Sequence, residues 1–409
     1  MEWKRIRLGD YISIKSGLAY SGSKIGKGDS VLLGMGCVSY KDKFVETGAR
    51  PYDDVCDDRF VVKPGDIVLA TRQQSDNLPI LAMPAVIPQC YQGKRVIFGT
   101  NLYKVENNSV ISNKFLFWLF KHQHYVNYIA GVKSGTAVQM VTKKNVEDYK
   151  FLCPPANVRD SISNILWTYD NLIENNNKRI HLLEQMAENL YKEWFVRFRF
   201  PGHENAEFEN GLPKGWKREK IGKVYNTCSG GTPSRVNEDF YNNGSIPWVK
   251  TGELQDCLIH DAEEFITEDA LKRSSAKLLP NHSLLMAMYG VNIGKLGILR
   301  KEMTCNQAVC AFLPKTADQT FYYLYFYLKG IRNYLLSISF GAAQQNLSQA
   351  LIKNVRIMIP HNDTLQKFEN KVSCYFDQIS IYQRQNEQLA RQRDLLLPRL
   401  MSGKLEVNI

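Results

Sequence analysis

The residue groups that most resemble enzyme motifs fail on spacing or on residue type. The run Gly290-Val-Asn-Ile-Gly294-Lys295-Leu296 looks like a phosphate-binding loop, but such a loop needs four residues between its glycines and Ser or Thr after the lysine. The run Cys153-Pro154-Pro155-Ala156 lacks the residues with which amino-methyltransferases hold the target amine and stack on the base. No GxSxG or HExxH motif is present. We therefore expect no catalytic residue in this chain.

The cysteines and histidines do not have the spacing of metal ligands. The nine cysteines are scattered along the chain, and no two of them form a CxxC pair. This spacing and the odd number favour reduced thiols in a cytoplasm over a disulfide framework. We expect no metal site and no cofactor bound by this chain itself.

The overall charge favours a polyanionic partner. The 409 residues include 52 Lys and Arg against 41 Asp and Glu, a formal net charge of +11. Nucleic acid is the commonest large polyanion for a basic protein, although charge alone fits a merely basic protein equally well. The longest near-apolar run, Phe321–Leu328, is too short to cross a bilayer, and the N-terminus lacks an apolar signal segment. We expect a cytoplasmic protein with no membrane partner.

The chain contains an internal repeat of about half its length. Trp3-Lys4-Arg5 returns as Trp216-Lys217-Arg218, 213 residues further along. Ser134-Gly-Thr-Ala-Val-Gln139 is matched by Phe340-Gly-Ala-Ala-Gln-Gln345 at an offset of 206. Matches in the same order in both halves predict two domains of similar fold.

Each half begins with short apolar runs punctuated by Gly, Pro and Asn and ends in a long helical pattern. Residues 66–70 and 283–287 are predicted strands, and the aromatic stretches at 115–120 and 321–328 are predicted core helices. We therefore predict an α+β fold with two similar domains, each followed by a long helix. The predicted boundaries are a first domain at 1–155, a helix at 156–200, a linker at 201–215, a second domain at 216–360, a helix at 361–402 and a tail at 403–409.

Both long helices carry apolar residues at alternating spacings of four and three, which is typical of a coiled coil. Two such seams in one chain predict an antiparallel intramolecular pair and an approximate two-fold relation between the domains. The predicted seam residues are Ile162, Leu166, Ile173, Asn176, Ile180, Leu183 and Leu190 in the first helix, and Phe368, Val372, Ile379, Asn386, Leu389 and Leu396 in the second.

Polar residues interrupt both seams. A buried Asn176 or Asn386 would set the register at some cost in stability, and the alternative is that one or both rotate out to solvent. In the second helix Arg393 also falls on the seam, and Pro398 predicts that this helix ends or kinks early.

Three motifs resemble the specificity (S) subunits of Type I restriction-modification systems. They are the central segment Leu190–His203 with Gly211–Trp216, the stretch Cys228-Ser-Gly-Gly-Thr-Pro-Ser-Arg235, and the ending Leu395–Leu405. Together with the duplicated layout, this resemblance covers essentially the whole chain.

The resemblance implies a non-catalytic DNA-recognition subunit. Each domain would be a target-recognition domain that reads one half of a bipartite, gapped site in double-stranded DNA, and the helices would form the spacer. Two methyltransferase subunits would dock on the chain and supply S-adenosylmethionine chemistry on adenine. Two motor–nuclease subunits could join them to form the restriction complex. The alternatives left open are a coiled-coil assembly scaffold without sequence-specific DNA binding and an enzyme with an unrecognised site.

Candidate DNA contacts are polar residues on Gly-containing loops placed alike in both halves, because base edges are read by Arg, Lys, Asn, Gln, Ser or Thr. Arg72, Gln73 and Lys295 are the favoured members. Each loop also has a structural interpretation, in which the polar groups cap turns. The candidates are Arg72, Gln73, Gln74, Lys133, Thr136, Gln139, Thr232, Ser234, Arg235, Tyr289, Asn292, Lys295, Gln344 and Gln345.

Overall fold

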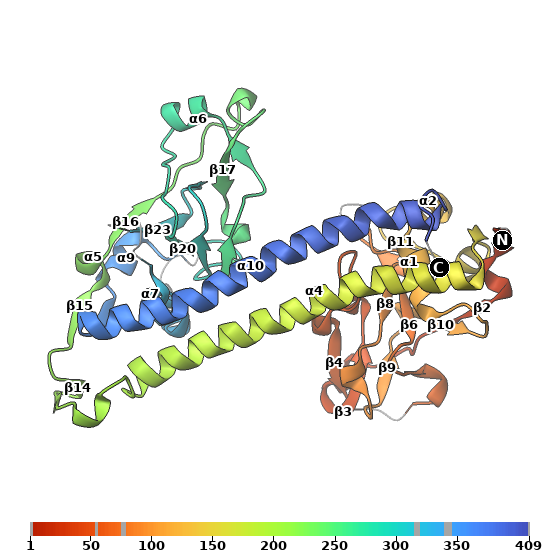
Figure 1. Cartoon of the computed structure of the whole chain (residues 1–409), viewed down its shortest axis with the longest axis horizontal. Coiled ribbons are helices and arrows are strands. Elements are labelled where there is room, and N and C mark those ends of the chain that lie inside the picture. The colour runs from red at the N-terminus through yellow and green to blue at the C-terminus, as the bar shows by residue number, and fades with distance from the viewer. Residues whose placement is uncertain (1–2, 54–55, 75–78, 315–319, 339–345, 408–409) are drawn as a thin grey trace. The chain divides into compact units, whose positions relative to one another are not determined.

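The chain forms two compact units in the computed structural model, which describes residues 3–53, 56–74, 79–314, 320–338 and 346–407. Unit 1 consists of Met1–Asn176 with Arg384–Ile409, and unit 2 of Asn177–Gln383. Two long helices, α4 (Ala156–Tyr191) and α10 (Asn362–Met401), each contribute residues to both units. Figure 1 shows these helices as the yellow-green and blue ribbons.

The globular part of unit 1 is built on two four-stranded sheets and two short strand pairs. The first sheet is wholly antiparallel in the order β2-β10-β6-β8, and the second has the order β4-β3-β9-β5 with β3 and β9 parallel. The strands are β1 (Lys4–Arg7), β2 (Ile12–Ser16), β3 (Ile25–Leu33), β4 (Ala49–Tyr52), β5 (Val61–Val62), β6 (Ile67–Ala70), β7 (Arg72–Gln73), β8 (Pro84–Val86), β9 (Val96–Phe98), β10 (Leu102–Asn107), β11 (Gln139–Met140) and β12 (Lys150–Cys153).

Unit 2 has a five-stranded sheet, β16-β23-β20-β21-β18, a three-stranded sheet, β19-β17-β22, and two strand pairs. Its strands are β13 (Phe208–Glu209), β14 (Leu212–Pro213), β15 (Lys217–Lys220), β16 (Asn226–Ser229), β17 (Ile246–Val249), β18 (Cys257–Ile259), β19 (Phe265–Ile266), β20 (Leu284–Ala287), β21 (Leu296–Leu299), β22 (Thr304–Cys305), β23 (Val309–Leu313) and β24 (Arg356–Ile359).

The two units repeat one topology, which confirms the predicted duplication. The antiparallel order β2-β10-β6-β8 in unit 1 recurs as β16-β23-β20-β21 in unit 2. The pair β1–β12 recurs as β15–β24. The predicted strands at 66–70 and 283–287 are β6 and β20, whose residues are all buried, as expected for continuous apolar runs in a sheet covered on both faces.

Both units also contain short helices. They are α1 (Asn113–Lys121), α2 (Gln123–Val132) and α3 (Lys143–Glu147) in unit 1, and α5 (Ile221–Val224), α6 (Glu268–Arg273), α7 (Tyr322–Gly330), α8 (Arg332–Ile338) and α9 (Gln349–Asn354) in unit 2. The predicted aromatic helices are α1 and α7, and both present buried side chains to the cores.

The N-termini of these two aromatic helices are capped in different ways. At α1 the side chain of Ser112, the preceding residue, accepts the backbone N–H of Phe115 at 3.3 Å. At α7 the cap comes from the long helix α10, where Glu369 accepts the N–H groups of Tyr322 and Tyr323 at 3.0 and 2.8 Å. Both caps satisfy backbone donors that a helix leaves unpaired in its first turn.

The long helices pair antiparallel within each unit, as predicted. In unit 1, Asp170 and Asn176 of α4 contact Arg393 and Asn386 of α10, so the partner number falls as the α4 number rises. In unit 2, Arg179 lies over the Tyr382 ring, 5.5 Å from its centroid, and the rings of Trp194 and Phe368 are 6.0 Å apart. After Tyr191, α4 continues as one π-helical turn, Lys192–Val196.

The predicted seam residues line this pairing. In unit 1, Ile162 and Leu166 belong to one buried core cluster, against which Leu396 packs. In unit 2, Phe368, Val372 and Ile379 are buried, and Ile180, Leu183 and Leu190 pack against them. Ile173 and Leu389 are half-buried. Each helix therefore has one apolar face that is covered by its partner and by a domain core.

Polar residues in the seam are paired with each other. Asn176 is 7% exposed and donates from Nδ2 to Oδ1 of Asn386 at 2.9 Å. Arg393 is 8% exposed and pairs with the buried carboxylate of Asp170 at 2.6 Å and with Asp394 at 2.8 Å. The asparagines thus point into the seam, and Arg393 is accommodated by an acidic partner on α4.

The expectation that Pro398 ends the second helix early is wrong. Pro398 lies inside α10, which continues to Met401. A proline removes one backbone donor and crowds the preceding turn, but only three helical residues follow it here. Leu397, Leu400 and Met401 are buried in the core of unit 1, and this packing holds the last turn in place.

The buried pair Asp170–Arg393 gives a stability prediction. Asp170→Ala leaves Arg393 without its buried partner, so the opening free energy of the helix pair in unit 1 should fall by about 3–5 kcal/mol. Hydrogen exchange of the backbone amides at residues 384–401 measures this loss. Asp394→Ala removes the exposed partner of the same arginine and should cost less than about 1 kcal/mol. Equal losses of opening free energy in the two variants would contradict the assignment of Asp170 as the main partner of Arg393.

Candidate nucleic-acid interface

The strand pair β7–β11 gathers the candidate residues of the first domain. Arg72 pairs with Met140 and Gln73 with Gln139 across this short antiparallel ribbon. Gln73 donates from Nε2 to Oε1 of Gln139 at 2.6 Å, and Lys133 donates to the same oxygen at 3.0 Å. Three of the predicted residues therefore form one polar cluster.

Within this ribbon some candidates hold the backbone and others face solvent. Gln73 is 4% exposed, and its Oε1 accepts the backbone N–H of Leu81 at 3.0 Å. Arg72, Gln74 and Thr136 are exposed. Burial raises the pKa of the neighbouring Tyr103, and the positive charge of Arg72 opposes that shift. The ribbon thus presents Arg72 outward while Gln73 fixes the turn behind it.

The motif Cys228–Arg235 of the second domain is held by close backbone packing. An added Cβ atom at Gly230 would lie 2.1 Å from the carbonyl oxygen of Cys305, and one at Gly231 would lie 2.3 Å from the carbonyl carbon of Ser275. Trp248 donates from Nε1 to the carbonyl oxygen of Gly231 at 2.9 Å. The two glycines are therefore required by packing.

Arg235, at the end of this motif, is placed by aromatic and acidic neighbours. Its guanidinium lies 4.2 Å from the ring centroid of Tyr241 and 5.0 Å from that of Trp248. It also pairs with Glu264 at 2.5 Å, and Lys250 pairs with the same carboxylate at 2.8 Å. Hydrogen bonds from Lys250 and Arg235 lower the pKa of Glu264, so this carboxylate stays charged between two cations.

The other candidates near this motif differ in exposure. Ser234 is exposed, whereas Thr232 is half-buried and donates its hydroxyl to the side chain of Gln307. Gln344 and Gln345 lie outside the described residues.

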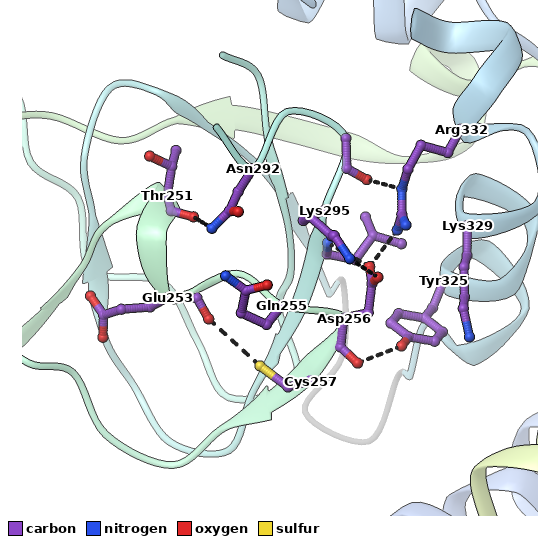
Figure 2. Close-up of polar contacts among 12 residues, drawn as sticks. Thr251, Glu253, Gln255, Asp256, Cys257, Asn292, Lys295, Tyr325, Lys329 and Arg332 are labelled. Carbon is purple, nitrogen blue, oxygen red and sulfur yellow. Dashed lines mark hydrogen bonds and ion pairs between the residues drawn. The ribbon is translucent and has the colours of Figure 1, made fainter. Parts of the chain in front are cut away.

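The loop between β20 and β21 carries the remaining candidates, and two of them make internal contacts (Figure 2). Asn292 donates from Nδ2 to the carbonyl oxygens of Thr251 and Gly252, both at 3.0 Å. Lys295 pairs with Asp256 at 3.2 Å, and Arg332 binds the same carboxylate. Tyr289 is half-buried at the start of the loop.

Asp256 is the centre of this group of contacts. Burial alone would raise its pKa, but hydrogen bonds from Arg332, the backbone N–H of Leu296 and Lys295 outweigh this and hold the pKa below its usual value. Its carbonyl oxygen accepts the hydroxyl of Tyr325 at 2.9 Å. Sequence reasoning missed Asp256 and Arg332, because nothing in the chain marks a contact between residues 76 positions apart.

Comparison with known proteins identifies the family. The family model described as the Type I restriction modification DNA specificity domain matches residues 1–185 and again residues 213–391. The chain belongs to this family. The two matches fall in the two halves of the internal repeat, and each includes a globular domain with most of the long helix that follows it.

Relatives of this specificity family match over most of the chain. The MjaIX specificity subunit of Methanocaldococcus jannaschii is 27% identical over 310 residues, which cover 74% of this chain and 71% of the relative. The MjaVIII specificity subunit of the same organism is 22% identical over 99% of this chain and 93% of its own. The crystal structure of the S subunit from M. genitalium has the same fold, with a TM-score of 0.61 at 15% identity over 98% of this chain and 96% of that one.

Two features of the described part of the chain bear on other functions. No cluster of three or more His, Cys, Asp or Glu residues there could hold a metal ion. No helix in the described ranges is long and apolar enough to span a membrane.

The exposed position of Arg72 leads to a binding prediction. Arg72→Ala should weaken binding to one half-site by about 5- to 150-fold, because a bidentate arginine–guanine contact contributes about 1–3 kcal/mol. Arg72→Lys keeps the positive charge but lacks the planar guanidinium that donates two parallel hydrogen bonds. This variant should therefore lose most of the base preference while it retains non-specific binding. Gel-shift titrations with matched and mismatched duplexes measure both. Unchanged affinity in Arg72→Ala would remove this residue from the interface.

Proposed function

We propose that this chain is the DNA sequence-specificity subunit of a Type I restriction-modification complex. Each half would read one part of a bipartite, gapped site in double-stranded DNA. The observation that carries the proposal is that one specificity domain occurs twice in a single chain, with the same antiparallel strand order in both copies. The +11 net charge supports a DNA partner, because phosphate contacts supply most non-specific affinity.

The catalytic steps are assigned to other subunits. Two methyltransferase subunits would dock on this chain and transfer a methyl group from S-adenosylmethionine to adenine. Two motor–nuclease subunits would complete the restriction form. This chain would itself be non-catalytic, which fits the failure of each enzyme motif in its sequence. All of these partners would act on DNA inside the cell, so the proposal places the complex in the cytoplasm.

The paired helices would set the gap between the two half-sites. Their register is specified by two polar contacts, Asn176–Asn386 and Asp170–Arg393, in addition to the apolar seam. Two weak readers in one chain also bind more tightly than either alone, because the second contact forms at a high effective concentration.

A surface on α4 is suited to docking a methyltransferase subunit. Leu182 and Met186 are one turn apart on the same face of the helix and are 57% and 50% exposed. They lie beside the seam, since Leu183 and Ala187 pack into the core of unit 2. A partner helix laid along this face would bury both side chains.

The gap proposal is tested by methylome sequencing of cells that carry this chain with its methyltransferase. A bipartite adenine-modified motif is expected. Seven residues inserted in both α4 and α10 should lengthen the gap by about three base pairs and leave both half-sites unchanged, because seven helical residues span about 10 Å. The same insertion after Gly211, in the turn between β13 and β14, should leave the gap unaltered.

A methylome without a gapped motif would contradict the proposed function. Equal binding of this chain to any polyanion would instead support the coiled-coil scaffold without sequence-specific DNA binding.

The docking surface predicts a loss of partner binding. Leu182→Glu with Met186→Glu should weaken association with the methyltransferase subunit at least tenfold, because two charges would be buried against the partner. Analytical ultracentrifugation of the mixed subunits measures this. His181→Glu adds one such charge on a different exposed face of the helix and should assemble normally. Normal assembly of the double variant would exclude this surface as the docking site of the methyltransferase subunit.

A further inference from the structure

The loop between β20 and β21 is fixed by its backbone conformation and by hydrogen bonds. Gly290 and Gly294 both take positive φ, +91° and +77°, which favours glycine. The backbone N–H of Ile293 donates to the carbonyl oxygen of Gly290 at 3.2 Å, and that of Gly294 to Ala287 at 2.8 Å. Backbone hydrogen bonds alone therefore define the conformation of this turn.

Contacts with two other segments, residues 251–256 and the start of α8, hold the loop in place (Figure 2). Asn292 is bonded to the carbonyl groups of residues 251 and 252, which precede β18. Arg332, at the start of α8, donates from Nε to the carbonyl oxygen of Gly294 at 2.8 Å and binds Asp256, the partner of Lys295. Asn292 and Lys295, two candidate base readers, therefore hold the loop.

The residue that the loop presents to solvent is Val291. Its side chain is fully exposed, at 103% relative accessibility, while the neighbouring Asn292 and Ile293 are half-buried. Valine is β-branched and has few rotamers, so a contact with it costs little side-chain entropy. Val291, on a fixed turn, can therefore make one apolar contact with a partner at little entropic cost.

The surroundings of Val291 favour DNA over a protein partner. Gln255 and Gly252 are exposed beside the loop, and Gln255 donates to the same carbonyl oxygen, that of Gly252, as Asn292 does. Lys295 is 37% exposed at the end of the loop. Protein interfaces concentrate their energy in clusters of large apolar residues. A single valine among polar and cationic groups instead matches a groove that displays one methyl group beside polar base edges and phosphates.

We propose that Val291 contacts the 5-methyl group of a thymine in the major groove of the half-site read by the second domain, and that Asn292 and the Asp256–Arg332 pair act as positioning residues for this contact. The inference rests on the proposed function. It makes Val291, rather than its polar neighbours, the residue that distinguishes thymine from cytosine at one position.

Deoxyuridine, which lacks the 5-methyl group, provides the test. The complex of the full chain with its methyltransferase is titrated with duplexes in which each thymine of that half-site is replaced in turn by deoxyuridine. One replacement should weaken binding to the native complex about fourfold, as expected for one buried methyl group. The same replacement should have no effect on the Val291→Ala complex, whose affinity for the natural duplex should already be reduced by a similar factor.

Controls separate this contact from other causes. Val110→Ala changes another exposed valine, in the first domain, and should retain the native response to deoxyuridine. Asn292→Ala should lose the fourfold discrimination without loss of assembly, because the tip is no longer held.

Three results would overturn the inference. The first is equal sensitivity of the native and Val291→Ala complexes to every deoxyuridine, and the second is sensitivity of neither. The third is a Val291→Ala chain that fails to bind its methyltransferase, which would make the valine a protein contact. A native complex that binds duplexes with the natural half-sites and duplexes with scrambled half-sites equally would overturn the proposed function itself.

Discussion

The fold of this chain depends on the antiparallel pairing of α4 and α10 around a seam that is mostly apolar but contains buried polar groups. An apolar seam alone tolerates sliding by a heptad, because one leucine replaces another at similar cost. A buried amide or carboxylate does not tolerate it, since a slip would leave the group without a partner in a low-dielectric environment. Asn176 with Asn386 and Asp170 with Arg393 therefore allow only one alignment in unit 1. The cores of both units pack on these paired helices.

A second constraint governs the loops that carry the candidate DNA contacts. A side chain that distinguishes bases must be held still, and the hydrogen bonds that hold it come from polar residues of the same types as those that read DNA. In both domains some of the candidates serve the loop itself. Gln73 closes the turn behind Arg72, and Asn292 and Lys295 fix the turn that presents Val291. The exposed residue at the tip is in each case the neighbour of a holding residue.

Much of the fold follows from local patterns in the sequence. The seam is periodic over 29 residues in each helix, the repeat is collinear, and runs such as Ile67–Ala70 are continuous apolar strands, so all three could be predicted. Pro398 was misjudged because a local rule about proline was applied where tertiary packing of Leu397 and Leu400 outweighs it. The roles within the loops could not be predicted, because they depend on Asp256 meeting Arg332 and on Gln73 meeting Leu81, contacts that only the folded chain brings together.

The different caps of α1 and α7 bear on how such chains can be recombined. The first domain contains its own cap, Ser112, so a gene fragment that ends before α4 would carry a complete helix start with it. The second domain borrows its cap from Glu369, which lies two turns inside α10. A transplanted second domain that lacks the beginning of this helix would leave two buried N–H groups of α7 unpaired. Exchange of the second domain between related genes should therefore succeed only with crossover points beyond Glu369, whereas exchange of the first is free of that restriction.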